Sequence, residues 1–133
     1  MLNKFISYLE KQVKNGAIYV WGGQGEIASQ AKIRAMETSE RNIERALKLY
    51  KERSKTFKSV RMFDCSGLVC KALEKCGVKK KGFDATANGL YKDHCKRIKK
   101  IDLRKGDLVF RIENGNAYHI GVVVSNDLDV IEA

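Results

Sequence analysis

The N-terminal part of the chain repeats its apolar residues at the spacing of an amphipathic helix. Between residues 3 and 13 the apolar positions fall on one helical face, with lysine and glutamate opposite: Phe5, Ile6, Leu9 and Val13. Asn15-Gly16 ends this predicted helix. A short apolar stretch at residues 17–21 follows, and the glycine-rich segment 22–25 predicts a turn.

Residues from about 26 to 58 carry many charges, yet their apolar positions keep a helical spacing. These positions are Ile33, Met36, Ile43, Ala46, Leu47 and Tyr50. Thr38-Ser39 offers a helix cap between two pieces. The charged block therefore predicts a helical hairpin with one apolar stripe, which is either a solvated pair of helices packed on the domain or a lid.

The remaining pattern changes from helices to strands. Two more helices are predicted, at residues 65–75 and at about residues 86–94. The last third alternates as strands do, and turns at Asn114-Gly115 and at about 125–127 separate three strands: residues 107–112, residues 118–124 and a final strand near Val130. Helices followed by an antiparallel sheet predict an α+β fold, in one domain spanning residues 1–133.

Composition narrows the class of protein. Apolar residues make up 44% of the chain, which argues against disorder, and no run approaches the ~20 apolar residues of a membrane span. The N-terminus lacks the continuous apolar centre and cleavage site of a signal peptide. We therefore expect either that the domain was cut out of a longer protein or that it leaves the cell by another route.

The net charge of +10 points to polyanions as partners, because such an excess attracts nucleic acid, anionic membranes and anionic polymers such as teichoic acid. A solvated lysine-rich surface explains it equally well. No basic run is interleaved with aromatic residues as in a nucleic-acid stacking platform, so no nucleic acid is expected.

The chain has four cysteines: Cys65, Cys70, Cys76 and Cys95. Their spacing lacks the paired C-x2-C knuckles of a structural zinc site, so we expect mostly reduced thiols and neither metal nor other cofactor. A metal or redox role for the four together is the alternative.

Cys65 lies where a thiolate nucleophile is expected. At the first turn of a helix, free N–H groups and the helix dipole stabilise the thiolate and lower the pKa of the thiol. Gly67, two residues later, allows other backbone or a substrate to approach closely. The competing interpretation is a small buried cysteine on a helix, which is common.

His119 is the better placed of the two histidines to act as a base. His94 lies in a charged stretch, whereas His119 begins an apolar strand that would hold its imidazole rigidly. A two-residue turn at Asn126-Asp127 would place Glu132 on the same face as His119 and diagonal to it, as the third, orienting residue. A change of one residue in the turn reverses the faces, which leaves Asn126 and Asp129 as alternatives, and His119 itself would also fit an ordinary sheet end.

Four segments resemble, in the same order, signature segments of the NlpC (p-sixty) family of cell-wall peptidases. They are Tyr19-Val20-Trp21-Gly22-Gly23, Phe63-Asp64-Cys65-Ser66-Gly67-Leu68-Val69, Arg104-Lys105-Gly106-Asp107-Leu108-Val109-Phe110 and His119-Ile120-Gly121-Val122-Val123-Val124. The resemblance implies a papain-like fold, with a nucleophile helix packed on an antiparallel sheet. It also implies hydrolysis of peptidoglycan stem peptides, typically between γ-D-glutamate and the diamino acid, without a cofactor.

By position, the resemblance makes Cys65 the nucleophile and His119 the base. It places Tyr19 beside the reacting centre, and Asp64 and Ser66 in the pocket that reads the N-terminal side of the substrate. The alternatives are a core tyrosine, a helix cap and an ordinary first-turn residue. The chain departs from the family at Glu132, where relatives usually carry His, Asn or Gln.

The resemblance leaves some alternatives of function and setting. An N-acetylmuramoyl-L-alanine amidase would use the same Cys and His, and a non-catalytic module would bind cell wall or a partner on the same fold. Residues 85–91 look most like the versions in phage tails and mobile elements. We therefore expect an extracellular or cell-wall location, reached as part of a larger protein or a phage particle.

Overall fold

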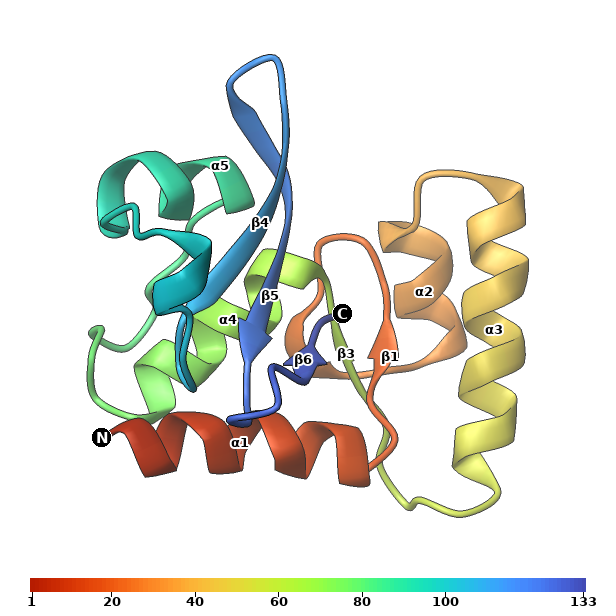
Figure 1. The fold of residues 1–133 in the computed structure, drawn as a ribbon. Helices are drawn as coiled ribbons and strands as arrows, with labels where there is room; N and C mark the ends of the chain where they lie inside the picture. The colour runs from red at the N-terminus through yellow and green to blue at the C-terminus, as the bar shows by residue number, and fades with distance from the viewer.

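The computed structural model describes residues 1–133 as helices packed around two three-stranded sheets (Figure 1). The helices are α1 (Leu2–Lys14), α2 (Gln30–Met36), α3 (Glu40–Ser54), α4 (Cys65–Lys75) and α5 (Ala87–Gly89), with a π-helical turn η1 (Leu90–His94) and a 3₁₀ turn η2 (Lys100–Asp102). The strands are β1 (Ile18–Tyr19), β2 (Gln24–Ile27), β3 (Arg61–Phe63), β4 (Leu108–Glu113), β5 (Asn116–Val123) and β6 (Val130–Ile131). This arrangement confirms the predicted α+β class.

The C-terminal sheet follows the predicted order of strands. It is antiparallel throughout, in the order β4-β5-β6. Val122 pairs with Ile131 and Val123 with Val130, which is the register that a turn at Asn126-Asp127 predicts. This register determines on which face of the sheet the residues after β6 lie.

The second sheet was not predicted. β3 pairs in parallel with β1 and antiparallel with β2, in the order β1-β3-β2. The expected turn at residues 22–25 is correspondingly shorter, because β2 already begins at Gln24. Its register shifts between Gln24 and Glu26, and Gly25 between them has a φ of +100°, which glycine adopts without strain.

One core lies between α1, α4 and the C-terminal sheet. Its largest fully buried side chains are those of Leu9, Phe63, Val69, Leu90, Ile120 and Val122. Figure 1 shows α1 running beneath α4 and beneath the lower ends of β5 and β6. This core fixes α4 against β5, the two elements that carry Cys65 and His119.

A second core joins the charged block to the small sheet. The predicted hairpin is confirmed as α2 and α3, and Ser39 caps α3 by accepting the N–H of Asn42 at 3.2 Å. Its apolar stripe packs on β1 and β3 in a separate cluster: Ile18, Val20, Ala28, Ile33, Ala46, Val60 and Met62. The hairpin is therefore packed against the strand that carries Tyr19.

We expect Ile33→Ala to lower the free energy of unfolding by about 2–5 kcal/mol, because Ile33 is fully buried in this second core. Ile101→Ala is the matched control, since Ile101 is 89% exposed and its loss should change stability by no more than about 0.5 kcal/mol. Denaturant unfolding of both variants measures the difference. Equal stabilities would mean that α2 does not pack on the small sheet.

Candidate active site

The start of α4 is fixed by the carboxylate of Asp64. Its Oδ1 accepts the N–H of Gly67 at 2.6 Å, which caps the helix, and its Oδ2 accepts the N–H of Gly22 at 3.1 Å. The Asp64 N–H in turn donates to the carbonyl oxygen of Gly23 at 2.9 Å. One residue thus joins the nucleophile helix to the turn between β1 and β2, and Cys65 follows it directly.

Gly67 is required by the same close approach. A Cβ on residue 67 would collide with the carbonyl oxygen of Gly23 and lie 2.7 Å from Asp64 Oδ1. The sequence interpretation of Gly67 as a position of close contact is therefore correct, and the contacting group is the backbone of the β1–β2 turn.

The Cys65 thiol is half-buried against the larger core. Burial raises the pKa of this thiol, and the charge of Asp64 adds to the increase, while the backbone N–H groups of Ile120, Ser66 and Cys65 oppose it. The expected lowering of the pKa by the helix start is thus outweighed by desolvation. A thiol of this kind needs a partner to take its proton.

His119 is oriented by Glu132. Its Nε2 lies 2.8 Å from Glu132 Oε2, and the side chains are 22% and 45% exposed. Gly121 lies two residues after His119 on β5. A Cβ at this position would lie 3.4 Å from Glu132 Oε2, so the missing side chain leaves room for Glu132 to reach His119. Because an ionised carboxylate only accepts hydrogen bonds, Nε2 carries the proton and Nδ1 is free to act as a base.

The Cys65 thiol, at the start of α4, lies against the backbone of β5 at the residue next to His119. The N–H that acts on the Cys65 thiol belongs to Ile120, the residue that follows His119. No hydrogen bond joins Cys65 to His119 in this structure. Asn126 and Asp129, the alternatives to Glu132, lie in the β5–β6 turn, where Asp129 bonds to Ser125 instead.

Tyr19 also lies near Cys65. Burial raises the pKa of its phenol, and the charges of Cys65 and Asp64 raise it further. A hollow of about 190 Å³ between α1, β1 and the end of the chain is lined by Tyr19 and Glu132. The hydroxyl of Ser66 donates to Asp64 Oδ1 at 3.4 Å, and these two residues flank Cys65 in the sequence.

The charged block supplies a contact that the sequence interpretation missed. Arg45 of α3 donates to the carbonyl oxygen of Tyr19 at 3.4 Å and lies over its ring, 5.5 Å from the centroid. Arg45 also pairs with the buried Glu37 at 3.6 Å, and Glu37 accepts the N–H of Trp21 at 3.1 Å. Helical spacing identified only the apolar positions of this block, and the packing of α3 on β1 shows the partner of Arg45.

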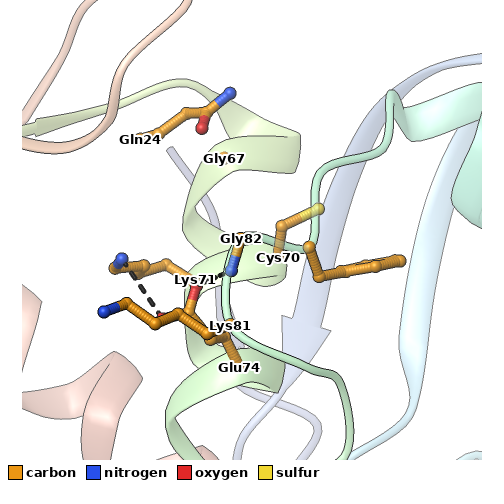
Figure 2. Close-up of a pocket in the computed structure, with 8 residues that line it drawn as sticks. Gln24, Gly67, Cys70, Lys71, Glu74, Lys81 and Gly82 are labelled. Atoms are coloured by element: carbon orange, nitrogen blue, oxygen red, sulfur yellow. Dashed lines mark hydrogen bonds and ion pairs between the residues drawn. The ribbon is translucent and has the colours of Figure 1, made fainter.

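The other cysteines lie apart from this arrangement. A recess of about 170 Å³ along α4 is lined by Cys70, Lys71 and Lys81. Figure 2 shows Cys70 pointing away from the two lysines. Burial raises the pKa of the Cys70 thiol to about 11, and that thiol donates to the Ala85 carbonyl oxygen at 3.4 Å. All four cysteines are free, and no three His, Cys, Asp or Glu side chains gather as a metal site. His94 lies against Lys79 and Phe83, away from Cys65.

A model of the NlpC/P60 family matches residues 16–132. The chain belongs to the NlpC/P60 family. This confirms the resemblance of the four segments, and the match extends across the charged block as well. No curated protein and no solved structure matches the chain.

NlpC/P60 membership supports cell-wall peptidase activity in general and peptidoglycan as the substrate. No helix of the structure is long and apolar enough to cross a membrane. The NlpC/P60 match does not assign the chemistry to particular residues, so the roles of Cys65, His119 and Glu132 rest on the geometry above.

We expect iodoacetamide to alkylate Cys65 faster than Cys70, Cys76 or Cys95 at neutral pH, because His119 takes its proton and only the thiolate reacts. In His119→Ala the raised pKa of the thiol is unrelieved, so alkylation of Cys65 should increase only as the pH rises into the alkaline range. Peptide mass spectrometry over a pH series measures this, with the buried Cys70 as internal control. Equal Cys65 rates at pH 7 in wild type and His119→Ala would contradict activation by His119.

Proposed function

We propose that the chain is a cysteine endopeptidase that cleaves peptidoglycan stem peptides, at the bond between γ-D-glutamate and the diamino acid. The observation that carries the proposal is the 2.8 Å contact between His119 Nε2 and Glu132 Oε2. In the proposal this contact leaves Nδ1 of His119 as the base for the half-buried Cys65 at the start of α4.

The reaction begins when Nδ1 of His119 takes the proton of the Cys65 thiol. The thiolate attacks the amide carbonyl carbon, and the resulting oxyanion accepts the backbone N–H of Cys65 at the helix start. The imidazolium then gives its proton to the leaving amine, and the C–N bond breaks to leave a thioester. Water, deprotonated by His119, cleaves the thioester, releasing the carboxylic acid and restoring the thiol.

Tyr19, Asp64 and Ser66 line the acyl side of this centre in the proposal. Asp64 is half-buried, and burial raises the pKa of its carboxyl, so a cationic amine beside it offsets the cost of its charge. A free N-terminal amine on the substrate is such a group. Delivery by a phage particle or a larger protein remains an expectation from residues 85–91 alone.

A soluble stem tetrapeptide tests the reaction directly. Wild type should release a product whose new N-terminus is the diamino acid, and Cys65→Ala should release none. His119→Ala should be slower by about 100- to 10,000-fold, because it loses the general base and acid. Mass spectrometry of the products reads the bond that is cut.

The same experiment on purified peptidoglycan separates the alternatives. An amidase would free whole stem peptides that begin with L-alanine. No product from either material, with a folded wild-type protein, would favour a non-catalytic binding module.

Glu132→Ala should lower kcat by about 10- to 150-fold, which corresponds to the loss of one hydrogen bond to a charged group. Glu132→Gln should retain more activity, because its amide oxygen still accepts the Nε2 proton. Glu113→Ala is the control, since Glu113 is exposed on β4 and forms no ion pair. Steady-state rates with unchanged thermal unfolding measure the effect, and equal rates for all three variants would remove Glu132 from the mechanism.

A further inference from the structure

A polar hollow of about 550 Å³ lies between α1, α4 and the small sheet, separate from the centre at Cys65. We call it the basic groove and define it by five of its lining residues: Lys11, Gln12, Arg61, Lys71 and Lys75. It adjoins the recess of Figure 2, with which it shares Gln24 and Lys71, and which adds Lys81. The two hollows form one track along the outer side of α4.

The side chains that line the basic groove carry a net positive charge. Four cationic side chains line it against a single carboxylate, that of Glu26, which accepts the backbone N–H of Gln24. Lys71 pairs with Glu74 at 3.4 Å, and Glu74 lines the adjoining recess, so Lys71 is already neutralised. Lys11 and Lys75 are exposed and form no ion pair or hydrogen bond, so both ammonium groups are available to an anion.

Gln12 gives the basic groove a second polar element. This side chain is only 8% exposed, yet its carboxamide forms no hydrogen bond within the protein, and it lines the hollow. The polar atoms of this amide are accessible in the hollow, because no buried side-chain nitrogen or oxygen of the protein lacks a hydrogen-bond partner. The amide can donate to a phosphate oxygen or accept from a hydroxyl group.

From this arrangement we propose that the basic groove binds an anionic polyol-phosphate chain of the cell wall. Unpaired lysines bind successive phosphates as point charges, and Gln12 binds a phosphate oxygen or a polyol hydroxyl. Tyr8 is the only aromatic residue in the lining, so the groove has no platform on which nucleic-acid bases stack. The choice of a wall polymer, rather than another polyanion, rests on the proposed function.

The position of the groove allows both sites to be occupied together. Lys71 and Lys75 lie about 9 and 15 Å along the axis of α4 from Cys65, from the rise of 1.5 Å per residue. At 3.6 residues per turn, their side chains leave α4 about 80–120° round the helix axis from that of Cys65. A polymer in the groove therefore holds the domain on the wall without covering Cys65.

Binding of a fluorescent poly(glycerol phosphate) chain, followed by anisotropy across a salt series, tests the proposal. The double variant Lys11→Gln/Lys75→Gln should bind about 30-fold more weakly, with a salt slope smaller by about 2. The control, Lys99→Gln/Lys100→Gln, removes the same charge from exposed residues outside the groove and should lose far less. Equal losses in the two double variants would overturn the groove in favour of general attraction to a basic surface.

Two further measurements identify the polymer that the basic groove binds and separate this inference from the proposed function. A single-stranded oligonucleotide of equal charge should bind more weakly than the polyol phosphate; tighter binding would overturn the choice of polymer. Binding requires no peptide cleavage, so it should persist in Cys65→Ala. In Lys11→Gln/Lys75→Gln, the rate of cleavage of the soluble tetrapeptide should be unchanged, and only cleavage of polymer-bearing walls should fall. A wild-type protein that binds the polymer but cleaves no peptide would refute the proposed peptidase activity and leave the groove standing.

Discussion

The site depends on two hydrogen bonds that the carboxylate of Asp64 accepts. This carboxylate accepts one N–H from the first turn of α4 and another from the β1–β2 turn, so a helix and a sheet distant in sequence meet at the residue before Cys65. Gly67 and Gly23 permit the contact because neither has a side chain. Any substrate-binding role of Asp64 is therefore combined with a structural one, and removing it would displace the nucleophile as well.

The second half of the site depends on strand register. The β5–β6 turn sets Val122 opposite Ile131, which brings Glu132 beside Gly121 and across to His119. The two halves meet only because the larger core packs α4 on β5. The charged block contributes at a third point, since Arg45 and the buried Glu37 hold the backbone at Tyr19 and Trp21. In this chain the hairpin thus helps to fix the position of the Tyr19 segment beside Cys65.

Sequence patterns predicted the features that depend on local chemistry. Helical periodicity and capping residues located the long helices, and turn length gave the register that places Glu132. The short strands β2 and β3 were missed, because three or four residues carry no periodicity and their pairing partners are distant in sequence. The pKa of Cys65 was predicted in the wrong direction, since burial depends on the packed core and not on the helix start. Arg45 and Gln12 likewise gained their roles only from tertiary contacts.

The central claim is that Cys65, activated by His119, forms a covalent acyl intermediate. Rapid acid quenching of the protein with a stem peptide, followed by peptide mapping, tests it most directly. The account predicts a mass increase equal to the acyl portion of the substrate on the peptide that contains Cys65, reduced in His119→Ala. Product formation with no adduct on Cys65, or an adduct on Cys95 instead, would contradict it.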